Sequence, residues 1–184
     1  MPRRRRRQPM DELLDIVNDA DLVTGQAMRS IVHQQGLLHR GVHVFLFNER
    51  GEMLIQKRSA DRANSPSLWD CSVSEHVKGG EKYLDAAIRG LKEELGVEGI
   101  SIERIGKIQM EYGLNDHEIS EIYEGRLNGK QVRFDPGEIS EVKFIGMDAI
   151  RTWIVDEKEK YCYWFIELMN WHFGFPENLK VVLR

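Results

Sequence analysis

Cysteine is nearly absent from this sequence of 184 residues, which contains only Cys71 and Cys162. The two are far apart, and neither belongs to a C-x-x-C pair, so a zinc ribbon or a dithiol redox motif is not indicated. Because two thiols in a chain of this length suit a reducing compartment, we expect a cytoplasmic protein.

Long apolar runs and a strong net charge are also missing. The longest apolar stretches, such as residues 42–47, are far too short to span a bilayer, so we expect no membrane association. The formal net charge is −4, which provides no overall field for nucleic acid and argues against nucleic acid as a partner. The remaining composition, 41% hydrophobic and 30% charged, is that of a globular protein, and the length fits one domain.

The one strongly basic segment is a run of five arginines at residues 3–7. No apolar segment follows it, so it is not a secretory signal. Such a run could tether the protein to nucleic acid or to an anionic surface, or it could be a solvated tail. Since one short basic block carries little specificity, we favour a disordered basic tail over residues 1–10 and a single domain over residues 11–184.

Hydrophobic periodicity predicts a mixture of strands and helices. Extended segments are predicted at residues 13–17, 22–27, 41–48, 53–57, 68–77, 100–111, 118–127 and 141–145. The first two and the next two should form hairpins, and the third is apolar enough to be buried on both faces. Helices are predicted at residues 81–95, 147–155 and 158–173, with a short helix or loop at 28–36. This mixture indicates an α/β (α+β) sandwich, in which the aromatic residues of the last helix, Trp164 among them, pack in the core.

The helix predicted at residues 81–95 carries a charged face. Its apolar residues form one stripe, and Gly96 follows where a left-handed cap is expected. Every fourth residue on the opposite face is charged, so Arg89 can hold its carboxylate neighbours there: Glu81, Asp85 and Glu93.

Two adjacent carboxylates, Glu93 and Glu94, lie near the C-terminal end of this helix, where the helix dipole disfavours negative charge. A divalent cation would offset that cost, and Mg²⁺ takes one or two carboxylates together with substrate phosphates. Adjacent glutamates are also common on helix surfaces, so the pair taken alone leaves a solvent-exposed role open.

The spacing around this pair resembles the Nudix box, which runs Gly, five residues, Glu, seven residues and then Arg-Glu-aliphatic-x-Glu-Glu-x-Gly-aliphatic. The matching positions here are Glu81, Arg89, Leu91, Glu93, Glu94, Gly96 and Val97. The resemblance covers residues 11–173 and implies the Nudix α/β/α sandwich with a mixed β-sheet. It also implies Mg²⁺ as the cofactor, with Mn²⁺ as an alternative ion, and a small-molecule diphosphate as the substrate.

Two positions depart from the box. Glu75 stands where the first Gly belongs, and Gly90 stands where the Glu after the Arg belongs. The backbone carbonyl or the carboxylate of Glu75 could still bind the metal. The Glu missing at position 90 binds metal or acts as a base in Nudix hydrolases, so hydrolysis would need a base from Glu118, Glu121 or Glu75.

The rest of the chain resembles the isopentenyl-diphosphate isomerase branch of the Nudix superfamily. In that branch histidines and carboxylates surround a metal, and the matching positions, with an associated tyrosine, are His39, His76, Asp116, Glu118 and Tyr112. Two imidazoles and two carboxylates suit a divalent metal. His33 lies one residue out of register with a further histidine ligand. The residues that match or flank those gripping the diphosphate are Lys57, Arg58 and Arg62.

Two positions argue against isomerisation. Ser74 stands at the catalytic cysteine of the isomerases, and a hydroxyl is a far weaker proton-transfer group than a thiol. Cys71, three residues earlier, cannot simply take its place. Gly90 lacks the arginine that isomerases carry there, whereas the pair Glu93 and Glu94 is hydrolase-like.

The sequence therefore predicts a Mg²⁺-dependent Nudix hydrolase that cleaves a diphosphate joined to another group, most plausibly a nucleoside diphosphate derivative. The expected catalytic residues are Glu93, Glu118 and Ser74. The expected metal ligands are Glu93, Glu94, Glu75, His39, His76, Asp116 and Glu118. Two alternatives stay open: an isopentenyl-diphosphate isomerase or a relative of it, and a catalytically silent Nudix domain that binds a phosphorylated ligand. Because Nudix relatives are often dimers, a homodimer is a possible assembly.

Overall fold

The computed structural model describes residues 11–113 and 115–183, so the basic tail predicted over residues 1–10 lies outside the described residues. The elements follow the chain in the order β1 (Leu13–Val17), β2 (Val23–Met28), α1 (Arg29–Gln35), β3 (His39–Phe47), β4 (Met53–Arg58), β5 (Trp69–Asp70), β6 (Val73–His76), α2 (Tyr83–Leu95), β7 (Ile102–Gly113), β8 (Asp116–Arg126), β9 (Ile139–Ile145), α3 (Met147–Asp156), α4 (Tyr163–Phe173) and β10 (Lys180–Leu183). No helix in these described ranges is long and apolar enough to cross a membrane.

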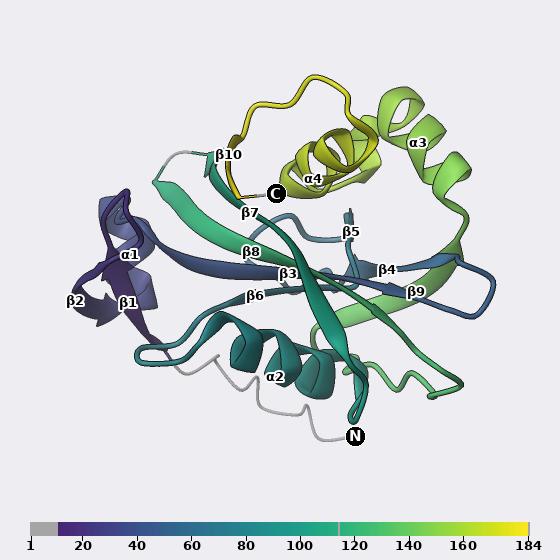
Figure 1. The fold of residues 1–184 in the computed structure, drawn as a ribbon, viewed down its shortest axis with the longest axis horizontal. Coiled ribbons are helices and arrows are strands. Elements are labelled where there is room, and N and C mark those ends of the chain that lie inside the picture. The colour runs from purple at the N-terminus through teal and green to yellow at the C-terminus, as the bar shows by residue number, and fades with distance from the viewer. Residues whose placement is uncertain (1–10, 114, 184) are drawn as a thin grey trace.

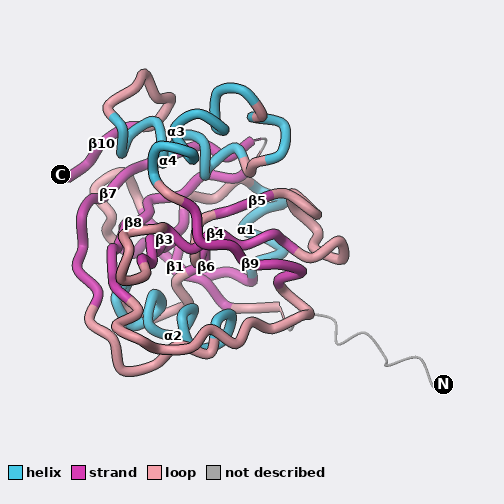
Figure 2. Tube along the Cα trace, turned by 90° about the vertical axis from the view of Figure 1, so that its right-hand side faces the viewer, coloured by secondary structure: helices cyan, strands magenta, loops and turns pink. Residues whose placement is uncertain are grey.

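The strands form one mixed sheet between two layers of helices (Figure 1). The main path of the sheet is β10-β7-β8-β3-β1-β2, while β6 pairs with β3, and β4 pairs with β5 and β9. β3 and β8 run parallel, and β3 and β6 run antiparallel. α2 covers one face of the sheet, whereas α3 and α4 cover the other (Figure 2). The α/β (α+β) sandwich with a mixed sheet that the sequence predicts is confirmed.

β3 is buried on both faces, as its apolar sequence predicts. Val42 and Leu46 pack in the core under α2, whereas Phe45 and Phe47 pack in a second core with Phe165 of α4. These four β3 side chains are at most 7% exposed. Because side chains alternate along a strand, the central strands present one set of residues to α2 and the other set to α3 and α4. This alternation decides which of the predicted site residues can meet.

α2 begins at Tyr83, two residues later than predicted, and ends at Leu95. Glu81 precedes the helix, and its carboxylate accepts a hydrogen bond from the backbone N–H of Lys78 at 2.9 Å. Gly96 has a φ of 63°, which confirms the predicted left-handed cap. A Cβ at Gly96 would also lie 3.0 Å from the carbonyl oxygen of Arg133, so the position requires glycine on two counts.

The prediction of one continuous helix over residues 158–173 is wrong. A 3₁₀ turn at Lys158–Lys160 is followed by Tyr161 in extended conformation, and α4 begins only at Tyr163. The backbone N–H of Cys162 donates to the carbonyl oxygen of Trp69 in β5 at 2.8 Å. This contact with a distant strand interrupts the helix, and periodicity within the segment cannot show it.

The predicted pairing of β3 with β4 is also largely wrong. Among the described residues the two strands pair only between Phe47 and Met53. Beyond that point β4 leaves β3 and pairs with β9 and β5. The sequence does not predict β10, whose four residues pair with β7. The first predicted hairpin, β1 with β2, is confirmed.

Candidate active site

Arg89 of α2 joins carboxylates from two elements. Its guanidinium donates to Glu81 at 2.9 Å, to Glu75 of β6 at 2.9 Å and to Glu93 at 3.3 Å. It also donates to the carbonyl oxygen of His76 at 2.8 Å. The predicted pairing of Arg89 with Glu81 and Glu93 is confirmed. Because one guanidinium contacts both α2 and β6, it positions Glu75 relative to Glu93.

Glu93 and Glu94 point in different directions from α2. The side chain of Glu93 is 56% exposed, whereas Glu94 is 6% exposed. Gln56 donates to Oε2 of Glu94 at 2.8 Å, and Oε1 is buried without a hydrogen-bond partner in the described part of the chain. Burial, followed by the charge of Glu75, raises the pKa of Glu94 well above its usual value. A buried carboxylate that is repelled by a second carboxylate is an arrangement that a divalent cation would stabilise.

Two of the three predicted phosphate-binding residues, Arg58 and Arg62, come from the end of β4 and the loop that follows it. Arg62 forms an ion pair with Glu138, and its pKa is lowered by burial and by the charge of Arg58, against the opposing charge of Glu94. Lys57 projects from the other side of β4, where its ammonium lies 5.8 Å from the centre of the Trp69 ring. The structure thus pairs Arg58 with Asp70 and Arg62 with Glu138, whereas Lys57 lies over the Trp69 ring.

Asp70 of β5 is a site residue that the sequence analysis misses. It is fully buried and accepts hydrogen bonds from Arg58 at 3.3 Å and from the indole N–H of Trp164 at 2.8 Å. The Arg58 guanidinium lies 5.3 Å from the centre of the Trp164 ring and donates to the carbonyl oxygen of Asn64 at 3.2 Å. One carboxylate therefore positions both a cation and an aromatic ring. No local pattern marks Asp70, because these partners come from β4 and α4.

A cavity of about 410 Å³ lies beside this group. Its lining residues are His33, Ala63, Asn64, Ser65, Gly113, Asn115, Asp116 and Trp164. Trp164 packs against the core, as expected from the sequence, but its ring also forms part of the cavity wall. The cavity connects the surroundings of Arg58 with the histidines described below.

We expect Asp70→Asn to weaken the binding of inorganic diphosphate in the presence of Mg²⁺ by about 10-fold or more. The reason is that Arg58 loses a charged hydrogen bond, an interaction worth about 1.5–3 kcal/mol, and no longer has a fixed orientation. Calorimetric titration measures the change. Asp61→Asn, which alters an exposed carboxylate in the loop between β4 and β5, is the matched control and should bind as the wild type does. Equal affinity in a folded Asp70→Asn protein would contradict the prediction.

Three histidines and two carboxylates meet beside the cavity. Nε2 of His33 lies 3.2 Å from Nε2 of His76, and Nδ1 of His33 lies 3.3 Å from Asp116. Glu118 Oε1 lies 3.4 Å from His39 and 3.5 Å from His76. The ligand atoms of the three histidines lie within 4.8 Å of one another, and so do those of His39, Asp116 and Glu118. The structure brings together the four residues expected from the sequence and adds His33.

The register of the central strands assembles this histidine cluster. The parallel pairing of β3 with β8 places His39 beside Glu118, and the antiparallel pairing of β3 with β6 places His76 beside Gly41. A Cβ at Gly41 would collide with the Glu118 carboxylate, so glycine is needed there. His33 comes from the last turn of α1 and not from a strand. It therefore reaches the cluster although it lies one residue out of register with the corresponding histidine of the isomerase branch.

The protonation states in the cluster suit a metal. Nδ1 of His39 lies 2.9 Å from the carbonyl oxygen of Leu37 and must donate to it, which leaves Nε2 to face Glu118. Burial lowers the pKa of His76 well below its usual value and keeps the imidazole neutral, the form that binds metal. Burial acts to raise the pKa of Glu118, but the hydrogen bond and charge of His39 outweigh it, so the pKa is lowered.

Two buried atoms of this cluster, Nε2 of His39 and Oδ1 of Asp116, make no hydrogen bond within the described residues. Each still faces an ionisable neighbour, Glu118 at 3.4 Å from His39 and His33 at 3.3 Å from Asp116. A neutral imidazole, an ionised carboxylate and unpartnered ligand atoms fit a divalent cation that accepts nitrogen and oxygen ligands. The donor set differs from the all-carboxylate group near Glu94, so the two locations suit different ions.

Ser74 lies on the same face of β6 as His76, which belongs to the histidine cluster. Its hydroxyl is 3.0 Å from Nδ1 of His43, 3.1 Å from the sulfur of Cys71 and 3.3 Å from Asp70. Burial lowers the pKa of His43, and burial raises the pKa of the Cys71 thiol well above its usual value. Ser74 is half-buried whereas Cys71 is fully buried, so the hydroxyl is the group able to face a ligand. A lone imidazole within an apolar strand gave no sequence signal for His43.

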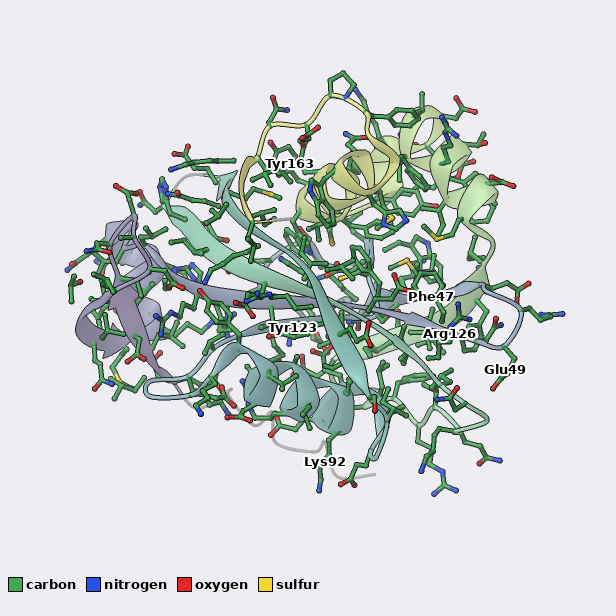
Figure 3. All side chains as sticks on the ribbon, in the orientation of Figure 1. Phe47, Glu49, Lys92, Tyr123, Arg126 and Tyr163 are labelled. Atoms are coloured by element: carbon green, nitrogen blue, oxygen red, sulfur yellow. The ribbon has the colours of Figure 1, made fainter. Side chains whose placement is uncertain are left out.

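Glu121 lies on the other face of β8. It pairs with Arg104 at 3.0 Å and with Lys107 at 3.6 Å, and it accepts a hydrogen bond from Tyr123, which lies between the sheet and α2 (Figure 3). Because strand side chains alternate, Glu118 faces the histidine cluster, whereas Glu121 faces α2. Because the Glu121 carboxylate is already paired with Arg104 and Lys107, Glu118 and Glu75 are the better placed candidates for a base.

Comparisons with known proteins agree with this geometry. The family model for the NUDIX domain matches residues 37–165. The chain is 32% identical over 165 residues to an isopentenyl-diphosphate Delta-isomerase of Serratia proteamaculans, covering 88% of this chain and 91% of the relative. It is also 31% identical over 134 residues to an uncharacterised Nudix hydrolase of Pseudomonas aeruginosa, covering 73% of this chain and 78% of the relative.

Solved structures show the same fold. The crystal structure of DR0079 from Deinococcus radiodurans superposes with a TM-score of 0.73 at 27% identity, covering 86% of this chain and 98% of that chain. The MutT protein of Methanosarcina mazei superposes with a TM-score of 0.60 at 20% identity, covering 74% and 95% of the two chains. The second likeness shows the fold alone.

Proposed function

Because the chain belongs to the NUDIX family, we propose that it is a cytoplasmic, Mg²⁺-dependent hydrolase that cleaves a small diphosphate. The favoured substrate is a nucleoside diphosphate derivative, in which the diphosphate is joined to a further group. One observation carries the proposal: Glu94 is a buried carboxylate with an unpartnered oxygen, repelled by the charge of Glu75 and attracted by that of Arg62. A cation would balance the two carboxylates, and the arginine would bind the diphosphate that this cation holds.

The proposed roles divide between the two arginines and the carboxylates. Arg58 and Arg62 bind phosphate oxygens, Arg58 in the orientation set by Asp70. Glu75, Glu93 and Glu94 hold Mg²⁺, for which Mn²⁺ can substitute. When bound there, the ion polarises phosphate oxygens and increases the acidity of water.

Further roles fall to the histidine side of the site. Glu118, kept ionised by its histidine neighbours, accepts a proton from the attacking water. Ser74 offers its hydroxyl as a hydrogen-bond partner to the substrate, with His43 as its neighbour. The residues that would hold a second divalent ion are His33, His39, His76, Asp116 and Glu118.

A second candidate function is the isomerisation of an isoprenoid diphosphate. The histidine cluster favours it, and so does the similarity to proteins named isopentenyl-diphosphate Delta-isomerase. The position that would have to transfer a proton to or from carbon is Ser74, and the adjacent thiol of Cys71 is buried with a raised pKa. A hydroxyl is poorly matched to that step at neutral pH, so hydrolysis is the favoured reaction.

A substrate screen separates the two functions. The purified protein is offered nucleoside diphosphates, nucleotide sugars, dinucleotides and isopentenyl diphosphate, each with Mg²⁺ or Mn²⁺. Phosphate release is measured, and isopentenyl diphosphate is also followed by mass-resolved chromatography for its isomer. The control is the double variant Glu93→Gln/Glu94→Gln.

The outcomes of the screen are distinct. Metal-dependent phosphate products that the double variant does not form would support hydrolysis and begin to name the second group. Isomer without phosphate release would replace hydrolysis by the second candidate. Binding of a diphosphate without turnover under either metal would contradict both and indicate a silent ligand-binding domain.

A further inference from the structure

The two departures from the Nudix box occupy contacting positions in the structure. Gly90 of α2 is buried against β6, and a Cβ there would lie 2.5 Å from Cγ1 of Val73 and 3.0 Å from Cγ of Glu75. Since the first distance is shorter than real Cβ atoms tolerate, no larger residue fits at position 90 while Val73 and Glu75 keep their places. Val73 therefore makes the closest contact with a side chain at position 90, and Glu75 occupies part of the space that a glutamate there would need.

The carboxylate of Glu75 also reaches the charged residues of α2 beside which the missing Nudix-box glutamate at position 90 would stand. Its Oε2 lies 2.9 Å from NH1 of Arg89, the nitrogen that contacts Glu93 at 3.3 Å. Its charge acts on Glu94, whose buried Oε1 has no hydrogen-bond partner among the residues of the described ranges. Glu75 is thus linked to both helix carboxylates: it shares Arg89 with the exposed Glu93, and its charge acts on the buried Glu94.

We propose that the box carboxylate missing at Gly90 is supplied by Glu75, so that strand β6 completes the metal-binding group of α2. The exchange is reciprocal: the strand carries the carboxylate and the helix carries the glycine. Its physical basis is the close approach of the two elements, which brings Val73 and Glu75 of the strand against the backbone of Gly90. The inference takes the identity of the metal, a divalent cation, from the proposed function. It concerns the binding of that metal and not the reaction.

The reciprocal variant is the sharpest test. Glu75→Gly, Gly90→Glu and the double variant Glu75→Gly/Gly90→Glu are compared with Mn²⁺ as the probe. All are made in a His33→Asn/His76→Asn background, so that Mn²⁺ bound by the histidine cluster does not contribute. Free Mn²⁺ is measured by electron paramagnetic resonance, and Tm is measured for every variant.

Glu75→Gly should weaken Mn²⁺ binding by about 10-fold or more, because one ligand is lost. Gly90→Glu alone should lower Tm, because its side chain collides with Val73 and Glu75. In the double variant the contact with Glu75 is relieved and Val73 has to shift, and the affinity should recover to within about 3-fold, since a carboxylate returns to the same contact between α2 and β6. Glu98→Gln, which alters a 65% exposed glutamate just after α2, is the control and should change nothing.

Unchanged affinity in Glu75→Gly would overturn the inference, and so would a folded double variant that binds as weakly as Glu75→Gly. If the double variant does not fold, Glu75→Gln decides: a similar loss of affinity supports the inference, and unchanged affinity refutes it. A protein that passes these tests but releases phosphate from none of the diphosphates offered would retain this inference and refute the proposed hydrolysis.

Discussion

Replacing Glu94 by glutamine should reduce turnover of the diphosphate substrate by about 100-fold or more, and it should make the metal-free protein more stable. Both effects have one cause. The Glu94 carboxylate is buried, repelled by Glu75 and only partly hydrogen-bonded, which favours a bound cation and disfavours the empty fold. Glutamine keeps the shape and the contact with Gln56 but carries no charge for the metal.

The stability gain should depend on pH with a definite sign. Because the pKa of Glu94 is raised in the folded state, its contribution to the free energy of unfolding is present in full below the usual value of 4.5 and is lost as the pH rises through the folded pKa. The increase in Tm of Glu94→Gln over the wild type, measured in EDTA, should therefore be present at neutral pH and vanish toward pH 4. Glu93→Gln is the control, because the side chain of Glu93 is 56% exposed. A lower Tm for Glu94→Gln at neutral pH would contradict the prediction.

Replacing Glu118 by glutamine should also reduce turnover by about 100-fold or more, but with the opposite effect on stability. Glu118 is buried between His39 and His76, at 3.4 Å and 3.5 Å, and its negative charge is stabilised there. Glutamine removes that charge and leaves the His39 imidazole without the carboxylate that raises its pKa. We expect a lower Tm for the metal-free protein, together with loss of the ion held by the histidine cluster.

The pH range of this destabilisation follows from the shifted pKa values of Glu118 and His39. The pKa of Glu118 is lowered, so its contribution is present above its usual value of 4.5 and lost as the pH falls. Burial acts to lower the pKa of His39, but Glu118 outweighs burial, so the pKa is raised. The contribution of His39 to the free energy of unfolding is therefore present below pH 6.5 and lost as the pH rises through the pKa of the folded state. The difference in Tm should therefore be largest between about pH 4.5 and 6.5.

Thermal unfolding in EDTA across this range tests the prediction. Glu111→Gln, which alters a 78% exposed carboxylate of β7, is the control for charge removal alone. A Glu118→Gln protein as stable as the wild type near pH 5.5 would show that the histidine cluster does not stabilise the Glu118 charge.

Patterns that are local in the chain predict much of the fold and part of the site. The period of α2, its glycine cap and the face shared by Arg89 and Glu93 depend on residues within one or two turns, so they follow from spacing alone. The two-sided burial of β3 follows from its apolar residues, which occupy both alternating sets of positions from Val42 to Phe47. The break before α4 and the pairing of β4 with β9 depend on distant segments, and for that reason spacing does not reveal them.

By itself the sequence determined which groups are available: the carboxylates of α2, the two arginines near β4, and the histidines and carboxylates carried by α1, β3, β6 and β8. Only the tertiary structure decided how they combine. It turns Glu94 inward and Glu93 outward, brings His33 into the histidine cluster, places Glu121 on the opposite face from Glu118, and sets Glu75 against Gly90. The physical reason is that each of these outcomes depends on the register between strands or on the distance between packed elements, and both are set by contacts between segments far apart in the chain.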